Sequence, residues 1–180
     1  MTTTSPAPTL TSGVWAIEPS HSEVGFTVRH LGMSKVRGRF NAFTGEVNIG
    51  DDLSTATVNV AIDLSSVDTN NSDRDGHLKS GDFFSVDTNP QMTFLSTAAS
   101  EDRLVGDLTV AGITRQVELA IEFHGVAVDG YETTRAGFSA SGVINRSEWG
   151  INFNAPLGMD GLLVSDKVAI ELEIQLVPIN

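Results

Sequence analysis

The chain has 180 residues, of which 40% are hydrophobic; this suffices for one domain with a packed core and excludes wholesale disorder. It contains no cysteine, which excludes disulfides, thiolate zinc sites and cysteine nucleophiles. The formal net charge of −12 argues against nucleic acid as a partner, because affinity for a polyanion rests mainly on Lys and Arg.

The N-terminal stretch MTTTSPAPTLTSG is rich in Thr, Ser and Pro, and it predicts a flexible tail over residues 1–12 ahead of one domain over residues 13–180. It lacks the basic start and the apolar run of about 7–15 residues that mark a signal peptide. No apolar stretch approaches the ~20 residues that a membrane helix needs. These features predict a soluble, cytoplasmic protein.

From Val14 onward, apolar and polar residues alternate with the period of two that marks half-buried β-strands. In the first half of the chain, the residues expected to point inward are Val24, Phe26, Val28, His30, Val36, Gly38, Phe40, Val58, Val60 and Ile62. In the second half they are Leu104, Gly106, Leu108, Val110, Val117, Leu119, Ile121, Phe123, Phe138, Ala140, Gly142, Val168, Ile170, Leu172, Ile174 and Leu176. The pattern predicts eight or nine strands.

Long antiparallel strands with one wet face must close or stack to bury the other face. Turn signals at residues 32–34, 50–52, 111–114 and 128–130 fit strands joined in an up-and-down meander. About eight such strands form a barrel wide enough for one small ligand. We therefore predict an all-β fold, an antiparallel β-barrel of about eight strands with one or two short helices. A two-sheet sandwich is the alternative.

Two stretches break the alternation. NSDRDGHLKS, residues 71–80, begins with Asn and Ser as candidate helix caps and predicts one or two helical turns. NRSEWGINFNAPLG, residues 145–158, is irregular and predicts a short helix before a loop.

Small residues fall on inward positions where a filled core would prefer Leu or Ile. They are Gly38, Gly106, Ala140 and Gly142. They mark either the bends that close a barrel or volume left empty inside it.

The first irregular stretch groups acidic and basic side chains. Asp75 and His77, together with His30, are candidates for the acid–base groups of an enzyme. One helical turn would not point Asp73, Asp75 and His77 at one spot, however. The alternative interpretation is structural: Asp73 and Asp75 stabilise the start of a helix, and Arg74 pairs with a carboxylate. We expect this polar segment to cap the barrel.

Metal and nucleophile motifs are missing from the sequence. The four histidines, His21, His30, His77 and His124, are far apart, and none has the spacing of a zinc site. There is no G-x-S-x-G elbow and no phosphate-cradling loop. We expect no metal, no cofactor and no catalytic residue.

His30 follows Phe26 and Val28 at every second position of its predicted strand, so its side chain is expected to point inward with theirs. It is either a buried neutral histidine held by a carbonyl or carboxylate, or a donor to the head group of a ligand. An unpaired buried imidazole costs about 1–3 kcal/mol, so a hydrogen-bond partner is expected in both cases. Both His30 and Arg146 are candidate partners for Arg74 and Asp75.

Four basic residues occupy the positions between the inward-pointing ones on two neighbouring predicted strands, so they are expected to form a basic stripe on the outside of the barrel. Arg29, Lys35, Arg37 and Arg39 make up four of only 11 Lys and Arg residues. The stripe is either a docking patch for transient contact with an anionic membrane surface or a solvated barrel exterior.

Four segments together resemble the YceI-like family. They are WAIEPSHSEVGFTVRHLGMSKVRGRF, DRDGHLKSGDFF, GDLTVAGITRQVEL and INRSEWGI, and the similarity runs in family order from Trp15 to about Ile174. The resemblance implies a lipocalin-like barrel that binds polyisoprenoid or other lipid chains in its interior and is not an enzyme. It also implies a possible homodimer, and many family members are secreted to the periplasm.

The expected function is the binding of a long-chain apolar lipid (a polyisoprenoid, an isoprenoid quinone or a similar molecule) for carriage, storage or sequestration. Leu78, Phe83 and Phe84 are expected to form the apolar underside of the polar cap. The residues predicted to bind the lipid are Phe26, Val28, His30, Val36, Phe40, Val58, Val60, Leu78, Phe83, Phe84, Met92, Phe94, Leu108, Phe138, Ile144 and Trp149.

Two other classes of function stay open at this point. One is an enzyme that acts on an apolar substrate through Asp75, His77 and His30. The other is an interaction module whose barrel is filled by its own side chains, with the four rings of Phe26, Phe40, Phe94 and Phe138 meeting at the centre.

Overall fold

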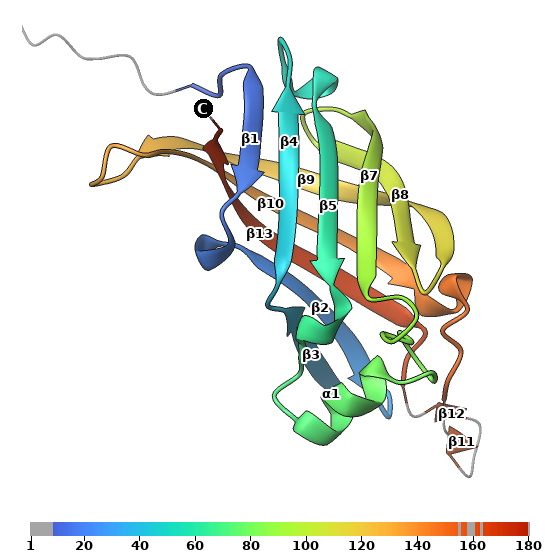
Figure 1. Cartoon of the computed structure of the whole chain (residues 1–180). Helices are drawn as coiled ribbons and strands as arrows, with labels where there is room; N and C mark the ends of the chain where they lie inside the picture. Colours follow the sequence, from blue (N-terminus) through green and yellow to red (C-terminus); the bar gives the residue numbers. More distant parts are fainter. Residues whose placement is uncertain (1–8, 155, 158–160, 163, 180) are drawn as a thin grey trace, which may run out of the picture.

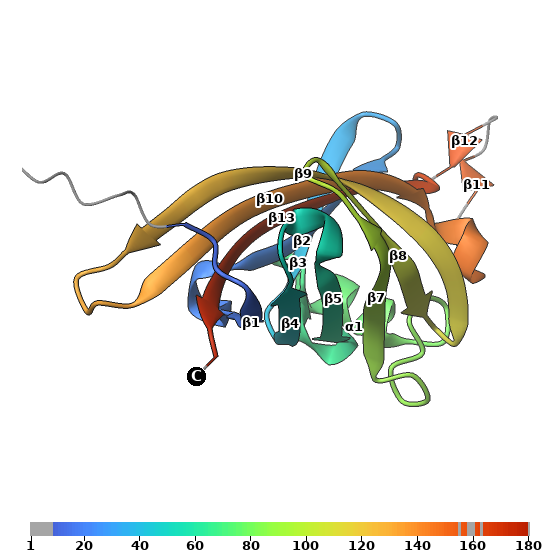
Figure 2. The same ribbon diagram turned by 90° about the horizontal axis from the view of Figure 1, so that it is seen from above.

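Antiparallel strands wind in chain order around one central space (Figures 1 and 2). The computed structural model describes residues 9–154, 156–157, 161–162 and 164–179. Its strands are β1 (Gly13–Ile17), β2 (Glu23–His30), β3 (Ser34–Phe40), β4 (Phe43–Ile49), β5 (Thr57–Asp63), β6 (Val67–Asp68), β7 (Gln91–Ala99), β8 (Arg103–Val110), β9 (Ile113–Val128), β10 (Thr134–Asn145), β11 (Pro156–Leu157), β12 (Gly161–Leu162) and β13 (Lys167–Pro178). The helices are α1 (Ser72–Lys79) and the short 3-10 turns η1 (Pro19–His21), η2 (Leu53–Thr55), η3 (Leu64–Ser66) and η4 (Arg146–Trp149).

The sheet closes on itself through β13. One edge of β13 pairs with β10, and the other pairs with β1 and then β2, which lie end to end along it. β3 and β4 likewise follow one another beside β2 and β1, and β6 and β5 continue the ring toward β7, β8 and β9. The barrel thus has eight strand positions, three of them formed by a broken strand. The predicted up-and-down barrel is confirmed, and the sandwich alternative is wrong.

Helical structure is confined to short segments. α1 falls on the predicted helical stretch, and η4 falls within the second irregular stretch, so both predictions are confirmed. Within the described part of the chain, no helix combines the length and the apolar character needed to cross a membrane.

Of the predicted N-terminal tail, residues 1–8 lie outside the described residues. Leu10 packs against the core, and Thr11 accepts a hydrogen bond from the Trp15 indole.

The bend between β1 and β2 is held by one carboxylate. Glu18 accepts hydrogen bonds from the Ser20 hydroxyl at 2.5 Å and from the backbone N–H of His21 at 2.8 Å. The His21 ring and the Arg135 guanidinium approach it at 2.7 and 3.7 Å. The Ser20 hydroxyl, with help from His21 and against the effect of burial, lowers the pKa of Glu18 from 4.5 to about 2. This accounts for the Glu-Pro-Ser-His run in the first of the four motifs.

Above pH 4.5, we expect Glu18→Gln to reduce the free energy of unfolding by about 1–2 kcal/mol, an amount typical of a lost helix cap. Because the folded pKa lies below the unfolded one, the carboxylate stabilises the fold above pH 4.5 and loses this effect as the pH falls toward about 2. Urea unfolding at a series of pH values should therefore show the two proteins converging in that window. Glu101→Gln, in the exposed β7–β8 turn, is the control. A difference that stays constant with pH would contradict the prediction.

The inward glycines of β3 and β8 are covered by aromatic rings. A Cβ at Gly38 would lie 2.3 Å from the Phe26 ring, and one at Gly106 would lie 2.4 Å from the Phe94 ring. Each ring thus occupies the place of the missing side chain on the neighbouring strand, as in the aromatic rescue of glycines in sheets. The idea that these two glycines leave empty volume is wrong; the missing side chains are replaced by the rings.

One inward assignment also needs correction. Phe123 was expected inside with the rest of its strand, but it is 39% exposed and stacks on Phe138 with ring centroids 4.9 Å apart. Phe123 keeps the parity of Ile121 and pairs with Phe138, and a register shift follows it, between Phe123 and Gly125 on β9 and between Gly137 and Phe138 on β10. Beyond it the β9–β10 hairpin extends away from the barrel, as Figures 1 and 2 show.

Candidate functional site

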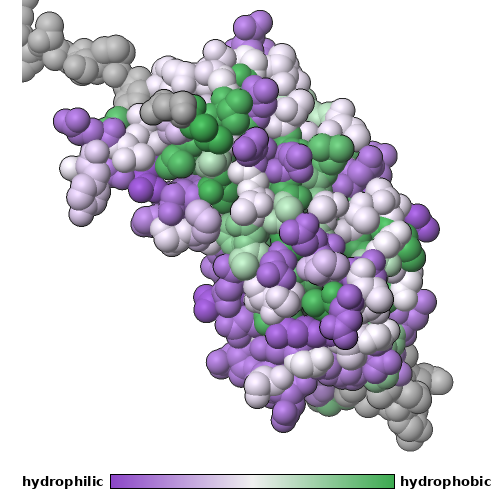
Figure 3. Space-filling model, viewed as in Figure 1, coloured by the Kyte–Doolittle hydropathy of each residue, from purple (hydrophilic) through white to green (hydrophobic). Residues whose placement is uncertain are grey.

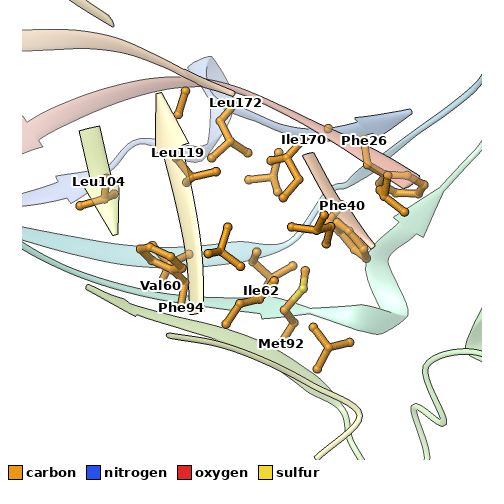
Figure 4. A pocket seen from close by; sticks show the side chains of 18 of the residues that line it. Phe26, Phe40, Val60, Ile62, Met92, Phe94, Leu104, Leu119, Ile170 and Leu172 are labelled. Atoms are coloured by element: carbon orange, nitrogen blue, oxygen red, sulfur yellow. The ribbon is translucent and has the colours of Figure 1, made fainter. Parts of the chain in front are cut away.

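The barrel encloses a cavity of about 520 Å³. It runs from α1, where Arg74 and Leu78 line it, to the β4–β5 and β7–β8 turns at the opposite end, where Leu53 and Ser100 line it. The side chains labelled in Figure 4 point into it from strands on different sides of the barrel, and the sulfur of Met92 is their only heteroatom. The middle of the cavity is therefore suited to an apolar chain.

The residues predicted to bind a ligand all line this one cavity. They are Phe26, Val28, His30, Val36, Phe40, Val58, Val60, Leu78, Phe83, Phe84, Met92, Phe94, Leu108, Phe138, Ile144 and Trp149. The structure brings them together from β2, β3, β5, β7, β8, β10, α1, η4 and the loop after α1. Their contact with a ligand stays a prediction.

The filled-barrel alternative is wrong. A cavity of about 520 Å³ lies within the range of about 300–1,000 Å³ that is usual for ligand pockets. The four phenylalanine rings do not meet at its centre: Phe26 packs against Phe40 with centroids 5.6 Å apart, Phe138 packs against Phe123, and Phe94 lies over Gly106. The rings are spread along the wall and leave the lumen open.

Helix α1 covers one end of the cavity. The Asn71 side chain caps it by accepting a hydrogen bond from the Arg74 backbone N–H at 3.0 Å. Leu78, Phe83 and Phe84 line the cavity beneath it, and Phe84 packs on Phe40 with centroids 5.9 Å apart. In Figure 3 the outer surface at this lower end is mainly hydrophilic. The segment is a polar cap with an apolar underside.

Thr69 is the residue that ties the cap to the barrel. It is 4% exposed, and the Asp75 carboxylate accepts hydrogen bonds from its backbone N–H at 2.9 Å and from its hydroxyl at 2.5 Å. The Arg74 guanidinium donates to the same hydroxyl at 2.7 Å and to the Thr69 carbonyl at 2.6 Å. Among the described residues, Arg74 forms no ion pair with a carboxylate, and neither Arg74 nor Asp75 bonds Arg146 or His30, so the predicted pairings are wrong for this part of the chain.

The two cavity histidines are held differently. The His77 Nε2 atom lies 2.9 Å from the Asp82 carboxylate, and its ring sits edge-on between Phe83 and Phe153 at 5.1 and 4.8 Å. The half-buried His30 ring has no hydrogen-bond partner among the described residues, contrary to the expectation that one would be present. The Asp75 carboxylate accepts from Thr69, and among the described residues no hydrogen bond joins it to either histidine.

Arg146 organises the loop between η4 and β13. It is 8% exposed and donates to four carbonyls, those of Ser165, Ile151, Phe153 and Val164 at 3.0, 2.9, 2.8 and 3.3 Å. Burial lowers the pKa of Arg146, an effect that the nearby Asp166 opposes. The guanidinium nonetheless stays charged, as arginine does throughout proteins. Arg146, the third residue of the INRSEWGI motif, thus holds this loop together at the edge of the cavity.

The titratable side chains that line the cavity in the described part of the chain are all arginines or histidines. The charged or titratable residues among the described lining are Arg29, His30, Arg74, His77, Arg103 and Arg146. None is an Asp or Glu, although the protein carries a net charge of −12. All but Arg103 lie at the end covered by α1. That end favours a polar or anionic group over a cation.

Several lining residues were missed. Ile170 and Leu172 have inward parity, so the alternation that placed them inside could also have included them in the site. Phe153 and Val164 lie in irregular segments, and Thr69 follows a two-residue strand. No periodic pattern marks these three, and only the folded chain brings them to the cavity.

Comparison with known proteins gives a consistent result. Residues 15–176 match the model of the YceI-like domain. A UPF0312 protein of Staphylococcus aureus strain USA300 is 40% identical over 164 residues, covering 87% of this chain and 93% of the relative. The YceI protein of Campylobacter jejuni is 27% identical, with a TM-score of 0.71 over 84% of this chain and 90% of that chain.

A more distant structure shares the fold. It is described as a polyisoprenoid binding domain from Saccharophagus degradans implicated in plant cell wall breakdown, and it is 13% identical, with a TM-score of 0.71. The alignment covers 92% of this chain and 98% of that one. At this identity the likeness concerns the fold alone. With the domain match over residues 15–176 and the 40% identity to the staphylococcal protein, the chain belongs to the YceI-like domain family.

Proposed function

We propose that the protein binds one long-chain apolar lipid, a polyisoprenoid or isoprenoid quinone, inside the barrel for carriage, storage or sequestration. The observation that carries this proposal is the cavity of about 520 Å³, which runs the length of the barrel between apolar walls. The shared fold of a domain described as polyisoprenoid binding supports a prenyl chain. None of the relatives named above is described as an enzyme, and Asp75 is engaged away from both cavity histidines.

The lipid would lie with its head group at the end covered by α1. Tail burial is non-directional, so orientation must come from polar groups at fixed points. His30, Arg74 and His77 supply such groups at this end, whereas the labelled wall in Figure 4 is apolar. The tail would then extend toward Leu104 and the β7–β8 turn.

The energetics favour exchange over trapping. Burying roughly 20 carbons, about as many as a cavity of about 520 Å³ can hold, at ~0.8 kcal/mol per methylene would give about 16 kcal/mol relative to water, close to the ~18–21 kcal/mol at which affinities saturate. The alternative site for such a lipid is a bilayer, where it is already out of water. The protein would therefore exchange lipid with membranes near equilibrium, which suits carriage or storage.

Gentle purification, organic extraction and mass spectrometry test the proposal. We expect one prenyl-chain lipid per protein molecule. Failure to recover any stoichiometric lipid, followed by failure to take up an added prenyl or acyl chain, would refute it.

We expect His30→Phe to keep its lipid but to bind a wider mixture of head groups. The His30 ring has no partner among the described residues, so it is available to a ligand. Losing one hydrogen bond of ~0.5–1.5 kcal/mol should weaken binding of the preferred lipid about three- to tenfold. The measurement is the identity and proportion of extracted lipids.

The control is His124→Phe, because His124 lies outside the cavity and its Nε2 atom contacts the Ser139 hydroxyl at 2.6 Å. Its lipid profile should match that of the wild type. If the His30→Phe profile also matches the wild type, His30 is a structural residue of the wall and does not select the head group.

A further inference from the structure

The β2–β3 hairpin carries a cluster of positive charge in an acidic protein. Residues 24–45 contain Arg29, Lys35, Arg37 and Arg39 and not one Asp or Glu. The whole chain has a net charge of −12, so without these four charges the remainder stands at −16. All four side chains are exposed. We call these four residues the basic face.

The pairing of the strands puts these charges side by side. Arg29 is directly opposite Lys35, and Arg37 and Arg39 follow on the same side of β3. Like charges directly opposite one another destabilise a sheet. Among the described residues, Arg29, Lys35 and Arg37 form no ion pair, and Arg39 makes only a long one of 3.8 Å to Asp68. In the part of the chain that the structure describes, one long ion pair is thus all that offsets the repulsion among these four charges.

The same two strands form part of the cavity wall. Val28, His30 and Val36, which alternate with the basic face, line the cavity, and Arg29 of the basic face lines it as well. The tip of the hairpin carries Met33, which is 75% exposed. Its backbone N–H donates to the His30 carbonyl at 3.0 Å and closes the turn. In Figure 1 the hairpin and α1 lie at the same end of the barrel. A surface that met the hairpin would therefore meet the capped end of the cavity.

We propose that the basic face and the Met33 tip dock on an anionic membrane surface, where the capped end of the cavity exchanges lipid with the bilayer. The inference rests on the proposed lipid-binding function. Basic side chains are attracted to anionic headgroups, and an exposed apolar side chain adds binding by entering the interface. The acidic remainder opposes this attraction only weakly, because exposed charges are screened beyond about 8 Å at physiological ionic strength.

Protection of a sheet edge is the competing explanation. Only Arg39 and Phe40 of β3 pair with β6, so the rest of β3 is an edge, and charged edges block pairing between molecules. Edge protection predicts that neutralising the charges causes self-association. Membrane docking predicts that it abolishes vesicle binding while the protein stays unassociated.

Flotation with vesicles distinguishes these outcomes. The probes are vesicles of phosphatidylcholine alone and of equimolar phosphatidylcholine and phosphatidylglycerol. We expect the wild type to bind only the anionic vesicles and to be released by high salt. Each basic side chain contributes a factor of about five, so the double variant Lys35→Gln, Arg37→Gln should bind about 30-fold more weakly. Arg115→Glu changes the net charge equally from β9, which does not pair with the hairpin, and should bind almost as the wild type does.

Equal binding to neutral vesicles, equal weakening by Arg115→Glu, or self-association of the double variant in sedimentation would each overturn the proposal. Tighter binding of soluble heparin than of anionic vesicles would overturn it too, by identifying a general polyanion site. Lipid extraction keeps the two proposals separate. The double variant should still contain its lipid, whereas a wild type that binds vesicles but contains and takes up no lipid would refute only the proposed function.

Discussion

Replacing Ala140 by tryptophan should leave the barrel folded and empty it of lipid. Ala140 lies in the middle of β10, opposite Ile121 on β9 and Leu172 on β13, and it is buried in the cavity wall. An indole there would occupy the lumen halfway along its length. Relative to water, each methylene excluded from the cavity costs about 0.8 kcal/mol, so displacing only two should lower the affinity for lipid in solution about tenfold, and a blocked tail should lose more.

The matched control for this variant is Ser141→Trp. Ser141 is the next residue of the same strand and is exposed on the outer face, so the same indole would leave the cavity untouched. Extracted lipid per protein, measured by mass spectrometry, should fall for Ala140→Trp and stay unchanged for Ser141→Trp, and titration with added lipid should show an affinity at least about tenfold weaker for Ala140→Trp alone. Overpacking should cost about 1–3 kcal/mol of stability, checked by urea unfolding. A folded Ala140→Trp protein with a full lipid load would place the lipid elsewhere.

The sequence predicts the cavity wall well because one physical rule governs it. Side chains alternate across a strand, so a barrel with a wet exterior must place every second residue inside. This rule identified Phe26, Val60 and Leu108 as wall residues without knowledge of the strand order. The rule puts Phe123 on the same face as its partner Phe138, but it does not say where a strand leaves the barrel. Phe123 lies just before the register shift beyond which the β9–β10 hairpin extends away, and it is 39% exposed.

The capped end could not be predicted in the same way. Its contacts join residues through irregular backbone: Asp75 and Arg74 both bond Thr69, and the Phe153 ring packs on His77. No spacing rule relates these positions. The sequence indicates the chemistry of the segment but leaves the partner of each charged group undetermined, which is why Arg74 was assigned to a carboxylate.

Phe153 links this end of the cavity to Arg146. Its ring lies 5.3 Å from that of Phe83 and 4.8 Å from that of His77, both of which line the cavity beside α1. Its carbonyl accepts from Arg146 at 2.8 Å. The arginine therefore holds in place the aromatic group on which the cap rests, and its loss should loosen the capped end as well as the loop.

Arg146→Met should reduce the free energy of unfolding by about 2–4 kcal/mol, because a side chain of similar length no longer satisfies four carbonyls at a buried site. Arg146→Lys should recover less than half of this loss, since one ammonium cannot reproduce the planar fork of donors. Urea unfolding gives the stability, and the rate at which bound lipid passes to acceptor vesicles reports the cap. We expect faster transfer in both variants. Arg115→Met removes an exposed arginine that, among the described residues, bonds only the neighbouring Thr114 carbonyl, so it should change stability by no more than about 0.5 kcal/mol. If Arg146→Met were as stable as Arg115→Met, the four carbonyls would be satisfied without the guanidinium, and Arg146 would not be what holds Phe153 against the cap.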